Sequence, residues 1–380
     1  MIVEFQSSGR AYRISAFRWE RSLNRRSVRA LKEEVADAVL PKLLQRLYAR
    51  RSASAAFAAD RLAVDGYSGR LVRSGVALGI VPSGRVGKDQ LAVRIQDAGI
   101  GTSPGAMGEL ARRLESLTKG EVQIRYIGSV VKCSSSQVPP TVRPWQQCEA
   151  RPILPGCSIG HFGTTAGSVG GFFHRDGCGS AVFILSNNHI LANESRARLG
   201  DVIIQPAPAD GGTILMSRVG TLAAEVPLNG IHGPVNFVDA AICEVDHDVK
   251  CTPVVGIGGT PWITGIRGAP LDVDDPVRKV GRSTEITEGT VSAIEVDDVW
   301  VDYDIGRLSF NGQIEIEGNG LSPFAIGGDS GSIVIDKDGK ACGLLFAVSS
   351  LGGPHGSGLA FANPIDEVVR NLNLSLANLR

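Results

Sequence analysis

The sequence lacks several features that would each point to a particular class of protein. It contains no run of about 18 apolar residues, so it offers no candidate membrane-spanning helix. Residues 1–20 carry arginines but no apolar core of signal-peptide length, which predicts a soluble protein that stays in the cytoplasm. Lysine plus arginine equals aspartate plus glutamate at 39 each, so the whole chain has no electrostatic bias toward nucleic acid or an anionic membrane.

Metal and disulfide patterns are also missing. The seven cysteines form an odd set without a Cys-x-x-Cys pair, which argues against a disulfide framework and a zinc site and predicts reduced thiols. Five of the six histidines lack ligand spacing. The acidic stretches 272–275 and 297–298 do not continue as calcium loops, so they are interpreted as solvated loops. The sequence therefore predicts no metal and no cofactor.

The N-terminal part divides into two regions. Residues 1–62 are first basic and then helical, with an apolar stripe from Val35 to Leu47 that is interrupted by Pro41. This pattern predicts a packing helix with a solvated basic face. A docking arm for a regulatory protein partner is the alternative, and nucleic acid is disfavoured because few aromatic residues lie among the arginines. Residues 63–132 predict a small α+β domain with strands at 76–80, 91–95 and 122–127 and a helix at 104–117.

The rest of the chain changes character. Residues 133–155 are rich in serine and proline and predict a linker. From residue 156 onward, short apolar runs alternate with glycine-bearing turns, which is typical of a β protein. Residues 364–375 predict a closing helix that opens at a proline.

One turn in the β-rich part points to chemistry. Gly327-Gly328-Asp329-Ser330-Gly331-Ser332 precedes an apolar strand, and glycines in such a place indicate a sharp turn or a close approach of the backbone. A nucleophilic serine needs such a turn, because its hydroxyl must project while nearby N–H groups point at a developing oxyanion. The same residues also make ordinary turns, so the motif requires partners.

Two residues could supply the base and the acid that orients it. His189 follows a buried-strand pattern that ends in small polar residues, and Asp239 lies within the apolar run 236–242, where we expect it inside a strand. A carboxylate in such a run is costly unless it is hydrogen-bonded, and an imidazole would satisfy it. The chain thus holds the three side chains that this kind of nucleophilic catalysis requires, a serine, a histidine and an aspartate. Along the sequence they come in the order histidine, aspartate, serine.

These segments resemble the motifs of chymotrypsin-like serine peptidases. The motifs are Leu185-Ser186-Asn187-Asn188-His189, Val238-Asp239-Ala240-Ala241-Ile242 and Gly328-Asp329-Ser330-Gly331-Ser332. Further features are similar to a bacterial branch akin to the plant narrow-leaf proteins, namely Gly156-Cys157-Ser158-Ile159-Gly160-His161, Thr165-Ala166-Gly167, residues 200–206 and residues 209–212. The resemblance covers residues 150–370 well and 70–130 loosely.

The resemblance implies a fold and a set of roles. It implies a trypsin-like peptidase domain at 156–380, with one six-stranded barrel at about 156–250 and a second at about 251–363. His189, Asp239 and Ser330 would form a Ser-His-Asp triad. The N–H groups of Gly328 and Ser330 would form the oxyanion hole. The substrate pocket would be lined by apolar residues that favour a small or medium uncharged side chain before the scissile bond, and these are Phe324, Leu345, Phe346 and Ala347.

Two positions depart from the family pattern. Phe346 stands where a small hydroxyl residue usually supports the aspartate, so that support must come from elsewhere. Secreted relatives free an N-terminus that pairs with the aspartate before the nucleophile, here Asp329, but the chain entering the first barrel reads Ala150-Arg151-Pro152-Ile153, a poor cleavage site. We therefore expect control by the N-terminal domains.

The sequence as a whole predicts an α+β N-terminal region followed by an all-β double barrel with a C-terminal helix. The predicted function is a serine endopeptidase that acts on protein or peptide substrates through an acyl-enzyme. Two alternatives stay open. One is a catalytically idle peptidase fold that serves as an interaction platform, and the other is a serine esterase that uses the same triad.

Overall fold

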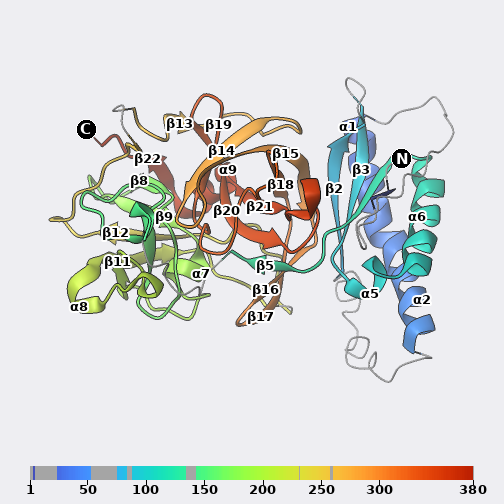
Figure 1. Ribbon diagram of the computed structural model, residues 1–380, viewed down its shortest axis with the longest axis horizontal. Coiled ribbons are helices and arrows are strands. Elements are labelled where there is room, and N and C mark those ends of the chain that lie inside the picture. Colours follow the sequence, from blue (N-terminus) through green and yellow to red (C-terminus); the bar gives the residue numbers. More distant parts are fainter. Residues whose placement is uncertain are drawn as a thin grey trace.

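The computed structural model describes residues 3–4, 24–52, 75–83, 88–133, 143–230, 232–256 and 260–379 (Figure 1). An N-terminal unit of helices and strands lies beside two β-barrel sheets, and a short helix follows near the C-terminal end. The predicted fold class is confirmed. The basic residues Arg10, Arg13, Arg18 and Arg21 lie outside the described part.

The first helices form a nearly continuous rod. Helix α1 (Arg25–Glu34) begins at Asn24, whose side chain accepts a hydrogen bond from the Ser27 N–H. A π-helical turn (Val35–Val39) leads into α2 (Leu40–Ser52). Pro41, which predicted an interruption, therefore stands in the first turn of α2, where its missing N–H costs little. The apolar stripe is buried against the sheet described next.

The N-terminal strands form a small sheet in the order β1-β4-β3-β2. Helix α6 is capped by Ser103 and opens at a proline. The predicted strands and helix are present with nearly the predicted bounds, and helices α1, α2 and α6 lie beside the sheet (Figure 1). The bounds are β1 (Val3–Glu4), β2 (Val76–Pro82), β3 (Asp89–Ile95), α5 (Ala98–Gly101), α6 (Pro104–Thr118) and β4 (Val122–Tyr126).

The first barrel sheet runs in the order β22-β8-β9-β12-β11-β10-β6-β7. Strands β8 and β9 form a hairpin that leads directly to His189 in the short helix α7. The bounds are β6 (Ser158–His161), β7 (Gly167–Ser168), β8 (Gly171–Arg175), β9 (Phe183–Ser186), α7 (Asn188–Leu191), β10 (Val202–Ile204), α8 (Ile214–Ser217), β11 (Arg218–Glu225), β12 (Ala241–Val245) and β22 (Leu374–Leu376).

The second barrel closes on itself, because β14, β15, β18, β21, β20 and β19 pair in a ring. The closing helix α9 (Ile365–Leu372) packs beside β20 and is shorter than predicted, because Leu374 begins a strand of the first barrel. The bounds are β13 (Gly265–Ile266), β14 (Pro276–Gly281), β15 (Glu285–Asp297), β16 (Val299–Tyr303), β17 (Gly306–Phe310), β18 (Gln313–Gly318), β19 (Ile333–Asp336), β20 (Lys340–Ser349) and β21 (Ala360–Pro364).

The N-terminal unit is joined to the second barrel. Strand β2 pairs with the end of β15, which continues one sheet into the other. The Arg94 guanidinium makes two hydrogen bonds with Glu315, at 2.7 and 2.9 Å, and both side chains are fully buried. Since a bidentate buried pair has one geometry, this contact fixes the unit on the barrel.

The basic face of α1 meets acidic residues of the barrel. Three pairs cross between the two parts: Arg25 with Asp272, Arg29 with Glu295, and Lys32 with Asp297. Lys32 is buried, so the prediction of a solvated basic face was wrong at that residue, whereas the side chains of Arg29 and Asp272 are 52% and 57% exposed. The two sets of charges have opposite sign and form ion pairs across the junction. Neither sequence segment alone could reveal this pairing.

Strand β5 (Val130–Lys132) lies inside the second barrel's sheet. It pairs antiparallel with β20 and parallel with β16. Figure 1 shows this strand reaching from the N-terminal unit toward the barrels. The sequence had placed these residues at the end of the α+β domain, just before a linker. Residues 134–142 of that linker lie outside the described part, and its remainder holds the turn Trp145–Gln147.

No helix in the described ranges is long and apolar enough to cross a membrane. All seven cysteines carry free thiols.

Candidate active site

Three loops bring the predicted triad residues to the junction of the two barrels. His189 lies in α7, directly after β9, and Ser330 lies in the turn between β18 and β19. Asp239 was expected inside a strand, but it precedes β12. Its backbone bonds to side chains rather than to a neighbouring strand, since its N–H donates to Asn363 and its carbonyl accepts from Asn187.

The three side chains form one hydrogen-bonded chain. The Ser330 hydroxyl lies 2.8 Å from His189 Nε2, and His189 Nδ1 lies 2.5 Å from Asp239 Oδ2. The carboxylate can only accept, so Nδ1 carries the proton and Nε2 is left to accept from the serine. The His189 N–H also donates to Asp239 Oδ1 at 3.2 Å. All three residues are buried, so the imidazole is held in one orientation.

Tyr303 supplies the support that Phe346 cannot give to Asp239. Its hydroxyl donates to Asp239 Oδ2 at 2.6 Å from the end of β16. Burial by itself would raise the pKa of Asp239, but His189 and Tyr303 outweigh it, and the pKa lies below its usual value. Burial and the neighbouring carboxylate raise the pKa of Tyr303 well above its usual value, so the phenol stays a donor.

The nucleophile turn is locked by its contacts with the first barrel. The Ser168 N–H donates to the Ser330 carbonyl at 2.7 Å, and the Ser168 hydroxyl donates to the Gly328 carbonyl at 3.0 Å. Gly331 has φ of +89°, and a Cβ there would lie 2.0 Å from Ser186 Oγ. Only glycine fits this position, which explains the glycine after the nucleophile.

Asp329 is satisfied without a free N-terminus. Its carboxylate accepts from the N–H groups of Ser283, Thr284 and Ile326 and from the Thr284 hydroxyl. Lys279 Nζ lies 3.5 Å away, and both side chains are fully buried. Burial lowers the pKa of Lys279, although Asp329 opposes the shift. Lys279 therefore supplies a buried positive charge beside Asp329.

The two predicted oxyanion-hole donors converge on one atom of this chain. The Gly328 N–H lies 2.6 Å and the Ser330 N–H 3.3 Å from the carbonyl oxygen of Cys133. The Cys133 N–H in turn donates to the Phe346 carbonyl at 2.9 Å. The cleft beside Ser330 is thus occupied by the end of β5.

Two of the four predicted pocket residues share an apolar cluster with Cys133. Cys133 is buried in the same apolar cluster as Phe324 and Leu345, and its thiol donates to the Ile326 carbonyl. Burial raises the pKa of this thiol, so it is neutral. Phe346 contributes its backbone, and Ala347 is the ladder partner of the neighbouring Lys132. All four predicted pocket residues are buried, but Phe346 and Ala347 belong to a different apolar cluster from Cys133.

Acidic groups flank Lys132, the residue before Cys133. The Lys132 ammonium pairs with Glu194 and lies 2.9 Å from Asp304 Oδ2. Glu194 is itself buried, and its two oxygens accept from the N–H groups of Asp304 and Ile305. The cleft therefore holds a fixed negative charge beside the position of Lys132.

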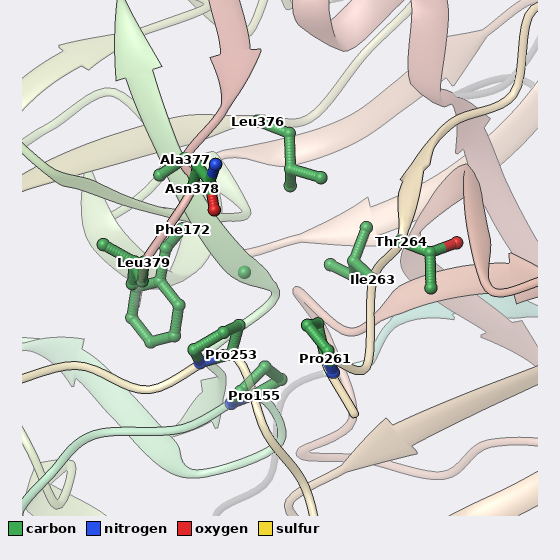
Figure 2. A pocket seen from close by; sticks show the side chains of 11 residues that line it. Pro155, Phe172, Pro253, Pro261, Ile263, Thr264, Leu376, Ala377, Asn378 and Leu379 are labelled. Atoms are coloured by element: carbon green, nitrogen blue, oxygen red, sulfur yellow. The ribbon is translucent and has the colours of Figure 1, made fainter. Parts of the chain in front are cut away.

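A separate pocket of about 360 Å³ lies away from this site. Pro155, Phe172, Pro253, Ile263 and Leu379 are among its lining residues, and none of the three triad residues lines it (Figure 2). Among the described residues, no group of three or more His, Cys, Asp or Glu side chains has an arrangement that could hold a metal ion.

The sequence analysis missed Tyr303, Lys279 and Cys133. Lys279 had a usable signal, because a lysine in the apolar strand 277–280 asks for a buried partner just as Asp239 does. Tyr303 was indicated only indirectly by the missing hydroxyl at position 346. Cys133 had no signal, since its place depends on the pairing of β5 with a strand more than 200 residues away.

No family model matches the chain, and no curated protein matches it. Solved structures that resemble it include Thermobifida fusca protease A, with a TM-score of 0.40, 19% identity and coverage of 59% of this chain and 98% of that one. Cellulomonas bogoriensis chymotrypsin has a TM-score of 0.39 and 19% identity, and the match covers 60% of this chain and 99% of that one. Nocardiopsis protease has a TM-score of 0.41 and 20% identity, and the match covers 60% of this chain and 99% of that one.

Proposed function

We propose that the protein is a serine endopeptidase in which Ser330 attacks a peptide carbonyl and forms an acyl-enzyme. One observation carries the proposal: the chain Ser330, His189 and Asp239 stands beside two N–H groups that converge on a single carbonyl oxygen. Hydrogen-bonded nucleophile, base and orienting acid, together with such a donor pair, are the parts that acyl transfer requires. The proposal includes membership of the bacterial branch akin to the narrow-leaf proteins, and the sequence motifs support this membership.

Each group has a defined task in the proposed reaction. His189 Nε2 takes the proton of the Ser330 hydroxyl as the oxygen attacks, and later gives it to the leaving amine. Asp239 keeps the imidazole in the required tautomer and stabilises its cation, with Tyr303 fixing the carboxylate. The N–H groups of Gly328 and Ser330 hold the oxyanion.

The apolar pocket indicates which residue precedes the cleaved bond. No carboxylate is among its predicted lining residues Phe324, Leu345, Phe346 and Ala347. The proposal is therefore a preference for small or medium uncharged side chains at that position. A panel of peptides that differ only there would test it, and a preference for Arg or Lys would contradict it.

Reaction of the purified full-length protein with a fluorophosphonate probe tests the function itself. The expected result is slow formation of a single adduct on Ser330, because Cys133 must first leave the Gly328 and Ser330 N–H groups. The adduct should be lost in Ser330→Ala, whose circular dichroism spectrum should stay unchanged. Hydrolysis of peptides by the unmodified protein, but not by Ser330→Ala, would complete the test. Absence of any adduct would favour an idle interaction platform, and turnover of esters without turnover of peptides would favour an esterase.

A further inference from the structure

We infer that residues 130–133 are this enzyme's own substrate, bound in cis, and that Ser330 cuts the peptide bond that follows Cys133. This inference rests on the proposed function and names the substrate on which the site first acts. It is carried by the backbone of the segment, the fit of its side chains and the position of one carbonyl group.

The backbone of the segment is bound as a substrate strand would be. Val130, Val131 and Lys132 pair antiparallel with Ser349, Val348 and Ala347 of β20. The ladder ends with the Cys133 N–H on the Phe346 carbonyl, and the carbonyl oxygen of the same residue accepts from the two oxyanion donors. An added strand is a common way for a protein to bind a peptide, and here it delivers one carbonyl to the nucleophile.

Three of the four side chains of the segment are buried or mostly covered by the protein. Cys133 is fully buried in the pocket, and Lys132 meets the charges of Glu194 and Asp304. Val131 is 41% exposed, whereas Val130 is fully buried. A strand places successive side chains on opposite faces, so Lys132 and Cys133 meet different sites. The lysine meets negative charge and the cysteine meets an apolar pocket.

The carbonyl of Cys133 is where the reaction would begin. The Gly328 and Ser330 N–H groups, at 2.6 and 3.3 Å, polarise this carbonyl and would hold the negative oxygen that forms on attack. An ordinary ladder bond uses one donor for each carbonyl, so two donors from the nucleophile turn on one oxygen form a built site.

The proposed cleavage has two stages, acylation of Ser330 and hydrolysis of the acyl-enzyme. The bond between Ser330 Oγ and the carbonyl carbon of Cys133 forms while His189 takes the hydroxyl proton. The carbon–nitrogen bond to residue 134 then breaks, and His189 gives its proton to the departing amine. Water hydrolyses the acyl-enzyme, leaving a carboxylate on Cys133 and a free serine.

The cut chain should stay together. The ladder between β2 and β15 and the buried Arg94–Glu315 pair are untouched by cleavage. Residues up to Cys133 would therefore remain beside the site as a bound product, and the cleft would open to other peptides only when β5 leaves it. The N-terminal unit thus acts on the site through β5.

Intact mass spectrometry of the full-length protein under denaturing conditions tests the inference. The expected result is two fragments that meet between residues 133 and 134, and only the intact chain in Ser330→Ala. Cys133→Asp places a carboxylate in the apolar pocket and should slow cleavage by about 100-fold or more. The matched control is Cys178→Asp at an exposed cysteine, which should be cut like the unmodified chain. Lys132→Glu should also slow cleavage, because it places a second negative charge beside Glu194.

The outcomes separate this inference from the proposed function. If the unmodified chain stays intact while Cys133→Asp forms a fluorophosphonate adduct on Ser330, the peptidase proposal stands and self-cleavage is overturned. An intact chain without an adduct in any variant would overturn both. Cleavage at another bond would overturn the inference, and so would cleavage of the Ser330→Ala chain when it is mixed with the unmodified protein, because the cut would then not be in cis.

Discussion

Two buried carboxylates, Asp239 and Asp329, serve the two barrels in different ways. Asp239 precedes a strand of the first barrel, and its partners are the imidazole of His189 and the phenol of Tyr303. Asp329 lies in the second barrel, and its partners are the ammonium of Lys279, a hydroxyl and three backbone N–H groups. Both carboxylates are fully buried.

The difference lies in what changes during the proposed reaction. The partner of Asp239 gains and loses a proton, so this carboxylate acts on the rate. The partners of Asp329 keep their charge, so this carboxylate holds the nucleophile turn in shape. Substitutions at the two sites should therefore separate reactivity from stability, and the size of each effect should follow the burial of the pair.

The largest effect on rate is expected for Asp239→Asn. The amide cannot hold the imidazole in the required tautomer, and in a triad of this kind the loss is about 10⁴-fold. The rate of fluorophosphonate labelling measures it, with circular dichroism as the control for folding. A loss smaller than tenfold would mean that Asp239 does not orient His189.

The largest effect on stability is expected for Lys279→Met. It leaves the Asp329 carboxylate buried without a counter-charge, which costs about 3–5 kcal/mol of the free energy of unfolding. Urea unfolding measures the cost. The double variant Lys279→Met with Asp329→Asn removes both charges and should recover a large part of it. If the double variant is no more stable than the single one, the two side chains are not coupled.

Tyr303→Phe should affect both properties, each moderately. Losing a hydrogen bond to a charged group costs about 1.5–3 kcal/mol at neutral pH, and labelling should slow by about tenfold. The pKa of Asp239 is lowered in the folded state, so this stabilisation is present above about pH 4 and is lost as the pH falls further. The difference in unfolding free energy between variant and unmodified protein should therefore shrink below that pH.

A matched control for this comparison is Tyr48→Phe, which removes a tyrosine hydrogen bond to Asp97 in the N-terminal unit. It should leave the labelling rate unchanged. An equal loss of rate in both variants would show that the effect of Tyr303 does not pass through Asp239.

The smallest effect is expected for Arg29→Ala. The Arg29–Glu295 pair joins α1 to the barrel, but the Arg29 side chain is 52% exposed. Exposed pairs contribute less than about 1 kcal/mol, because water screens them and long side chains lose freedom. Urea unfolding at low and high salt should show a small difference that shrinks with salt. A cost equal to that of Lys279→Met would contradict the role assigned to burial.

Local patterns were enough to predict the β-rich part and the residues of the hydrogen-bonded chain. The turn around Ser330 needs glycine at 331 because a Cβ would strike Ser186, and that constraint is written in the sequence. The hairpin before His189 and the helix after Ser103 also follow from alternation and capping, which act over a few residues.

The remainder depends on contacts between distant segments. Tyr303 reaches Asp239 from a hairpin of the other barrel, and Arg25 reaches Asp272 across the junction with the N-terminal unit. Cys133 reaches Ser330 only because β5 enters a sheet between β20 and β16. Neither period nor spacing specifies such pairings, so Cys133 was interpreted as the start of a linker.

The most direct measurement is a crystal structure of the full-length Ser330→Ala protein, which cannot acylate and keeps the chain intact. The account predicts the Cys133 carbonyl oxygen within hydrogen-bond distance of the backbone N–H groups of residues 328 and 330, with Lys132 beside Glu194. A cleft without residues 130–133, or one filled by another segment, would contradict it.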